Sequence, residues 1–143
     1  MIAVDTNILV YAHRRDSQFH RPASEIVRRL AEGRAAWAIP WPCIHEFLAI
    51  VTHPRIYNPP SSVEAALAQA DAWLDSPALV VLSEGADHWE VLSGFLASGA
   101  VTGARVHDAP VAALCAATGV RELWSADRDF SRFPITVRNP LIE

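Results

Sequence analysis

Short apolar runs alternate along this chain with longer segments in which apolar residues recur every three or four positions. Runs of three or four apolar residues bounded by polar or turn residues are typical of buried strands. Such runs predict strands at residues 2–4, 36–39, 79–82, 123–125 and 135–137. Because strands alternate with helical segments, we expect an α/β sandwich with a largely parallel sheet.

The segments between these runs have helical periodicity and recognisable end signals. Gly33 and Gly119 are suitable helix stops, and Ser61 with Glu64 has the form of a capping box. We therefore expect helices over residues 5–13, 22–32, 42–51, 61–75, 89–99 and 108–119, and loops over residues 14–20, 53–60 and 100–107.

The length of 143 residues and the hydrophobic content of 51% are sufficient for one domain with its own core, so we expect residues 1–143 to form a single domain. No apolar stretch reaches the roughly 18 residues of a membrane span, and the N-terminus lacks the basic region of a signal peptide. Cys43 and Cys115 form no CxxC motif and are interpreted as buried free thiols. These features predict a cytoplasmic protein with no membrane partner.

Four acidic residues are placed at the ends of otherwise apolar segments. Asp5 follows the first predicted strand, Asp127 follows the fourth, and Glu46 and Asp108 lie near the starts of helices. Ligand sites in parallel sheets lie beyond the carboxyl ends of the strands, so these four side chains can meet at one edge. Carboxylates that converge repel one another, and oxygen ligands suit Mg²⁺ or Mn²⁺. The pattern predicts metal-assisted chemistry on phosphate esters.

Each acid also has a simpler interpretation when it is considered alone. Asp5 and Asp108 can be ordinary N-caps, and Glu46 can be an ordinary surface residue. Asp127 and Asp129 flank Arg128, so either can cap a turn or form an ion pair. The metal-site hypothesis therefore depends on the set of acids and not on any single member.

All twelve basic residues are arginine, and the net charge is −4. The absence of lysine excludes a Walker A loop and Schiff-base catalysis. Receiver and haloacid-dehalogenase-like folds also require a lysine, and the second class expects an aspartate at the position of Asn7. A polyanion would bind only through local arginines or a bound metal. The candidate pairs, each of which can equally be a solvated surface, are Arg14 with Arg15, Arg28 with Arg29, and Arg128 with Arg132.

Four segments resemble motifs of the PIN-domain ribonucleases, and within them most closely the VapC-type toxins of bacterial toxin–antitoxin pairs. These segments are IAVDTNILV at 2–10, HEF at 45–47, HDA at 107–109 and LWSADRDF at 123–130. The resemblance covers essentially the whole chain. It implies a PIN-like three-layer α/β/α sandwich with a mostly parallel five-stranded sheet in the order 3-2-1-4-5.

The resemblance also implies an endoribonuclease toxin that requires Mg²⁺ or Mn²⁺, with transfer RNA as the expected substrate. It further implies a homodimer and inhibition by a cognate antitoxin protein. The residues that match the family's catalytic, metal-binding quartet are Asp5, Glu46, Asp108 and Asp127. Asp129 matches a further acidic position, and the polar positions that orient the acids or the attacking water correspond to Thr6, Asn7 and Ser125.

The chemistry is consistent with the acids independently of the family. A metal ion lowers the pKa of a bound water and neutralises charge on the scissile phosphate, so no histidine pair is needed. His107, which precedes Asp108, is the one histidine considered for a substrate or proton-relay role. Two alternatives stay open: a PIN-like binding module without activity, and a metal-dependent DNA nuclease or phosphatase. No function is assigned to the proline-rich loop 53–61. We also expect that the five tryptophans are not all in the core and that exposed ones favour protein interfaces.

Overall fold

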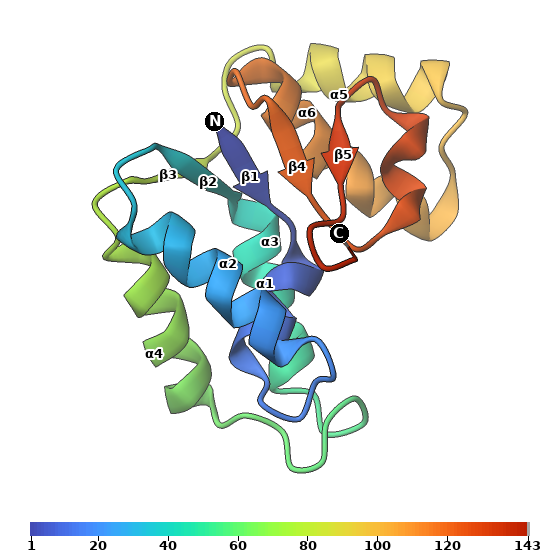
Figure 1. The fold of residues 1–143 in the computed structure, drawn as a ribbon. Helices are drawn as coiled ribbons and strands as arrows, with labels where there is room; N and C mark the ends of the chain where they lie inside the picture. The colour runs from blue at the N-terminus through green and yellow to red at the C-terminus, as the bar shows by residue number, and fades with distance from the viewer. Residues whose placement is uncertain (143) are drawn as a thin grey trace.

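The computed structural model describes residues 1–142, so Glu143, the last residue of the expected domain, lies outside the described residues. Five parallel strands form one sheet in the order β3-β2-β1-β4-β5 (Figure 1). The strands are β1 (Ile2–Val4), β2 (Trp37–Pro40), β3 (Leu79–Leu82), β4 (Glu122–Trp124) and β5 (Val137–Arg138). The expected sheet order is confirmed, and the predicted strands are correct to within two residues at each end.

Six α-helices connect the strands. They are α1 (Thr6–His13), α2 (His20–Glu32), α3 (Trp41–Val51), α4 (Val63–Leu74), α5 (His88–Ser98) and α6 (Ala109–Ala117). Two 3₁₀ helices, η1 (Gly103–Asp108) and η2 (Arg128–Arg132), complete the described chain, and η1 lies where the sequence predicted a loop. None of the helices within residues 1–142 is long and apolar enough to cross a membrane.

The strand order determines which face of the sheet each helix covers. The chain steps from β1 to β2 to β3 in one direction and then returns across the sheet to β4. Crossover connections between parallel strands are right-handed, so α1–α4 and the pair α5 and α6 lie on opposite faces. Consistently, α1 contacts α2 and α3, and α5 contacts α6. In Figure 1, α2 and α4 lie together on one side, and α5 and α6 lie beyond β4 and β5. The architecture is the three-layer sandwich that the sequence implied.

The core forms where the central strands are covered on both faces. Val4, Trp37 and Leu123 have no exposed surface, which explains why these strands are continuous apolar runs in the sequence. Phe47 of α3 contacts Trp73 of α4 edge to face, with the ring centroids 4.8 Å apart. Such an aromatic pair contributes about 0.5–1.5 kcal/mol beyond its buried area, and here it joins the two helices that connect β2 to β3.

The predicted capping box at the start of α4 is wrong. Ser62, one residue later than expected, occupies the N-cap, and its Oγ accepts a hydrogen bond of 3.0 Å from the backbone N–H of Ala65. Ser61 instead has its Oγ 2.9 Å from Nε2 of His13. The two serines are locally equivalent, and the contact with His13 at the end of α1 decides between them.

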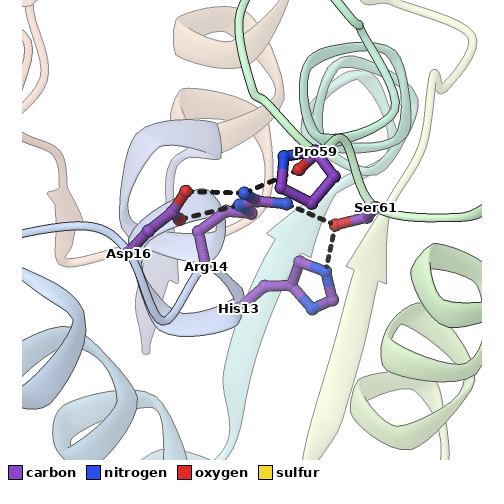
Figure 2. Close-up of polar contacts among 5 residues, drawn as sticks. All are labelled: His13, Arg14, Asp16, Pro59 and Ser61. Carbon is purple, nitrogen blue, oxygen red and sulfur yellow. Dashed lines mark hydrogen bonds and ion pairs between the residues drawn. The ribbon is translucent and has the colours of Figure 1, made fainter.

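The proline-rich loop before α4 is held against the end of α1 by Arg14 (Figure 2). The Arg14 guanidinium forms an ion pair of 2.6 Å with Asp16 and donates to the Pro59 carbonyl at 3.0 Å and to Ser61 Oγ at 3.2 Å. It also lies 4.2 Å from the centre of the Tyr57 ring. Arg14 therefore has a structural role in holding this loop, and RNA binding by Arg14 with Arg15 stays a prediction.

Candidate active site

Asp5 lies at the point where β1 ends and α1 begins. It occupies the N-cap position of α1, but its side chain forms no capping hydrogen bond, so the simple N-cap interpretation is wrong. Asp5 is only 6% exposed. Its Oδ2 accepts a hydrogen bond of 2.7 Å from Ser125 Oγ, and Cys43 Sγ donates to its Oδ1 at 3.5 Å. Three segments of the chain thus converge on one carboxylate.

Ser125 connects the ends of β1 and β4. Besides donating to Asp5, its Oγ accepts from the Asp127 N–H at 3.0 Å and from Asn7 Nδ2 at 3.4 Å. The side-chain oxygen of Asn7 in turn accepts from the Ala126 N–H at 3.1 Å. Asn7 and Ser125 therefore hold the turn after β4 against the start of α1, and their role in orienting the acids for catalysis stays a prediction.

Glu46 is joined to the same region through Thr6. Thr6 is 4% exposed, and its Oγ1 lies 3.4 Å from Oε2 of Glu46 on α3. Because Thr6 directly follows Asp5, this contact brings the second turn of α3 next to the first turn of α1. The Glu46 side chain consequently points toward the other acids, although Glu46 lies off the apolar stripe of its helix.

Asp108 ends η1 and precedes α6, and its side chain also forms no capping hydrogen bond. It faces a cleft of about 620 Å³ that also contains Glu46 and His107. The full lining is Pro42, His45, Glu46, Ala49, Ala104, His107, Asp108 and Pro110. The cleft gives Glu46 and Asp108 a shared approach from solvent, and it includes the histidine that the sequence singled out.

Asp127 and Asp129 have different environments. Oδ1 of Asp127 accepts a hydrogen bond of 2.8 Å from the Asp129 N–H and so caps η2. The Asp129 carboxylate instead forms an ion pair with Arg105 of η1, which lowers the pKa of Asp129. Asp129 is therefore already paired with a cation of the protein, unlike the four acids of the quartet.

The quartet shares one electrostatic environment. Burial, followed by the charge of Asp127, raises the pKa of Asp5 above its ordinary value. Burial and the charge of Asp5 raise the pKa of Glu46, although the nearby His107 opposes this shift. For Asp108, burial and then the charges of Asp127, Asp5 and Glu46 raise the pKa to about 6. A cation placed among these groups would relieve the repulsion that these shifts report.

The donor set suits Mg²⁺ held partly through water. Within residues 1–142, no three His, Cys, Asp or Glu side chains are arranged to hold one metal ion directly. Mg²⁺ commonly keeps several waters and is bound by only one or two carboxylates. Carboxylate oxygens that interact through space, without forming a closed cage, fit this mode of binding. The assignment of all four acids as metal-binding residues stays a prediction.

Three features of the site were missed in the sequence. Cys43 lies one helical turn before Glu46, and this spacing could have identified it as a neighbour of the acids. Arg105 forms an ion pair with Asp129, which is far from it in the sequence, and no local sequence pattern indicates this pairing. Trp41 and His45, at the start of α3, stack with their ring centroids 5.9 Å apart.

The other candidate arginines and the two cysteines lie in different environments. Arg28 and Arg29 form ion pairs with Glu25 on the exposed surface of α2, which confirms the solvated-surface alternative for that pair. Arg128 lines a second cleft of about 420 Å³ that also contains Ser125 and Asp127. Cys43 and Cys115 are buried free thiols, as expected.

Comparison with known proteins places this geometry in a family. Residues 2–135 match the family model described as PIN domain. Ribonuclease VapC43 of Mycobacterium tuberculosis is 34% identical over 142 residues, which are 99% of this chain and 96% of that protein. Ribonuclease VapC48 of the same organism is 31% identical over 137 residues, or 95% of this chain and 94% of that protein.

Solved structures share the fold. Mycobacterium tuberculosis VapC20, titled a Sarcin-Ricin loop cleaving toxin, has a TM-score of 0.68 at 21% identity and covers 92% of this chain and 93% of its own. VapBC2 from Rickettsia felis, bound to a DNA fragment from its promoter, has a TM-score of 0.65 at 21% identity and covers 97% of this chain and 98% of its own. The family-model match, the relatives and the shared fold agree, and the chain belongs to the PIN domain family, with VapC ribonucleases among its relatives.

Proposed function

We propose that this chain is a Mg²⁺-dependent endoribonuclease toxin that hydrolyses RNA phosphodiester bonds and is inhibited by a cognate antitoxin. The observation that carries the proposal is the shared environment of Asp5, Glu46, Asp108 and Asp127, in which three of the four carboxyl groups have raised pKa values. The relatives named VapC ribonucleases support RNA as the substrate. The VapBC2 structure supports an antitoxin partner.

The residues of the chain have separate tasks in this proposal. A bound Mg²⁺ or Mn²⁺ would supply an activated water and neutralise charge at the scissile phosphate. Ser125 fixes the Asp5 carboxylate through its 2.7 Å hydrogen bond, and Thr6 orients Glu46. Asp108 meets substrate from the open side of the cleft that it shares with Glu46. Positioning of this kind is the contribution that a rigid scaffold makes to phosphate-ester hydrolysis.

The expected products are a 5′-phosphate and a 3′-hydroxyl: water attacks the phosphorus, the bond to the 3′-oxygen breaks, and that oxygen leaves with a proton from solvent. No histidine is then required as an acid or base, and His107 would contact substrate only from the rim of the cleft. We further propose transfer RNA as the substrate class and the cytoplasm as the place of action, since the RNA targets are there.

The test compares one protein preparation on three substrates: RNA, DNA and a small phosphomonoester. With Mg²⁺, RNA should be cleaved, and removal of the metal by EDTA should stop cleavage. Asp5→Asn and Asp108→Asn should each reduce cleavage by at least about a hundredfold. The matched control is Asp71→Asn, an exposed acid on α4 outside the site, which should retain full activity.

The same assay separates the alternatives. Preferred cleavage of DNA would identify a DNA nuclease, and hydrolysis of the monoester alone would identify a phosphatase. RNA binding without cleavage would identify a binding module. Retention of RNA cleavage by both site variants would remove the quartet from the mechanism. Sequencing of the cleaved RNA ends would then identify the target and the cut site.

A further inference from the structure

An exposed aromatic pair lies at the start of α3. The rings of Trp41 and His45 are separated by 5.9 Å between centroids and are inclined by only 17°, so they are nearly parallel. The two residues are four apart on one helix and therefore lie on the same side of it. Trp41 is 38% exposed, and His45 is exposed as well. A large indole ring thus reaches solvent while a second ring supports it.

This pair lies between two clefts. The cleft that contains Glu46 and Asp108 is also lined by Pro42 and His45. A third cleft of about 570 Å³ is lined by Trp41, Pro42 and His45 together with Ser83 and Glu84, which follow β3. We call the cleft that contains Glu46 and Asp108 the catalytic cleft. Because Pro42 and His45 line both clefts, an RNA strand that lies in the catalytic cleft can continue across Trp41 and His45.

Binding of RNA in this region needs a contribution other than charge. The net charge of the chain is −4, and the catalytic cleft contains two acids. Among the described residues that line these two clefts, none is arginine. Stacking of a base on an aromatic ring does not depend on phosphate charge and tolerates any base, because every base has a π-face.

We propose that Trp41, supported by His45, is a stacking platform for one unpaired base of the RNA substrate next to the scissile phosphate. This proposal rests on the proposed ribonuclease function and adds a requirement for a single-stranded nucleotide beside the cut site. Trp41 binds and positions the RNA in this proposal, and the acidic quartet remains responsible for hydrolysis.

The test measures RNA binding in a protein that cannot cleave. The probe is a labelled, unstructured RNA of about eight nucleotides, titrated into the Asp5→Asn variant with and without Trp41→Ala. We expect the dissociation constant to rise about tenfold, which corresponds to the loss of one stacked base. Trp41→Phe, which keeps a smaller ring, should give an intermediate value. Trp89→Ala removes a tryptophan that is 72% exposed on α5 and should have no effect.

A second measurement uses the cleavage reaction with Mg²⁺. Trp41→Ala should raise KM more than it lowers kcat, since the platform acts in binding. Substrates in which one nucleotide at a time is abasic should then be tested with the wild-type protein, and KM should rise when the base that stacks on Trp41 is missing. With Trp41→Ala, removal of that same base should leave KM unchanged.

The outcomes separate the two proposals. Absence of RNA binding and cleavage in the wild-type protein would overturn the ribonuclease function and the platform with it. Normal cleavage by wild-type protein and by both Trp41 variants, with melting temperatures unchanged, would overturn the platform alone. Loss of antitoxin binding with retention of RNA binding in Trp41→Ala would also overturn it and assign this surface to a protein partner.

Discussion

Ser125 Oγ lies 2.7 Å from Oδ2 of Asp5, and both side chains are almost completely buried. The two residues follow β4 and β1, which are adjacent parallel strands. A buried carboxylate needs hydrogen-bond donors, and this hydroxyl is the closest side-chain donor to Asp5. The position of the Asp5 carboxylate therefore depends on Ser125, a residue outside the acidic quartet.

Replacement of Ser125 by alanine should weaken both stability and cleavage. Ser125→Ala leaves the buried Asp5 acceptor and the Asp127 N–H without this partner, and we expect a loss of about 1–3 kcal/mol in the free energy of unfolding. Urea denaturation followed by tryptophan fluorescence measures this loss. Ser98→Ala removes a serine that bonds only within α5, and it should be nearly neutral. Equal stability of the two variants would show that the Ser125 hydroxyl contributes little.

Without metal, the acid cluster should make the protein less stable as pH rises. The pKa of Asp108 is raised from 3.8 to about 6, so the folded state binds more protons than the unfolded state between these values. The contribution of Asp108 to the free energy of unfolding then falls as pH rises from about 4 to about 6 and levels off above that, because stability rises with pH only where the unfolded state binds more protons.

Asp108→Asn should remove the contribution of Asp108 to the pH dependence of the free energy of unfolding. In EDTA at about pH 8 we expect the variant to be more stable than wild type, by about 1–2 kcal/mol once the partial exposure of Asp108 is allowed for. Denaturation at about pH 5 and about pH 8 tests this, with Asp71→Asn as the control. A variant less stable than wild type at the higher pH would contradict the repulsion argument.

Mg²⁺ should stabilise the folded protein, and more strongly at neutral than at acidic pH. An ion that binds only the folded state at 100 times its dissociation constant adds about 2.7 kcal/mol. Protons compete with the ion for carboxylates, so the effect should weaken below about pH 6, the pKa of Asp108. Thermal melts across a Mg²⁺ titration at two pH values measure it. A melting temperature that responds equally in wild type and Asp108→Asn would remove Asp108 from the ion's environment.

We expect a homodimer in solution. Large apolar side chains are exposed, including Trp89, Val63 at 60% and Leu67 at 49%, and the last two lie one turn apart on α4. Light scattering at micromolar concentration should give twice the mass of the chain. Leu67→Glu should shift the protein toward monomer, whereas Ala68→Glu, an exposed neighbour on the same helix, should not. A wild-type monomer would exclude the homodimer.

Antitoxin inhibition should compete with Mg²⁺. An arginine of the antitoxin that enters the acidic cleft can pair with Glu46 or Asp108, since charge-assisted pairs with carboxylates are short and often bidentate. Inhibition should therefore weaken at high Mg²⁺ and when that arginine is replaced by alanine. Kinetics across a Mg²⁺ titration measure this dependence. Inhibition that is insensitive to both changes would favour occlusion by bulk alone.

The sequence by itself determined the helices and strands and the positions of the acidic residues at their ends. Val4 and Leu123 are in buried strands because short apolar runs are covered on both faces, and this requirement is visible locally. Asp5 directly follows β1 and Asp127 lies three residues after the end of β4, so their location at one edge of a parallel sheet could be inferred before any contact was known. The order of the strands, however, came from resemblance to a family and not from periodicity.

The tertiary structure alone decided which side chains meet. Ser62 caps α4 because its neighbour Ser61 lies against His13, and a local motif cannot distinguish two adjacent serines. Asp129 is paired with Arg105, and Cys43 touches Asp5, through packing of segments far apart in the chain. Hydrophobic periodicity reports only how deeply each position is buried, whereas hydrogen bonds and pKa shifts depend on distances of a few ångströms that exist only after the segments have packed.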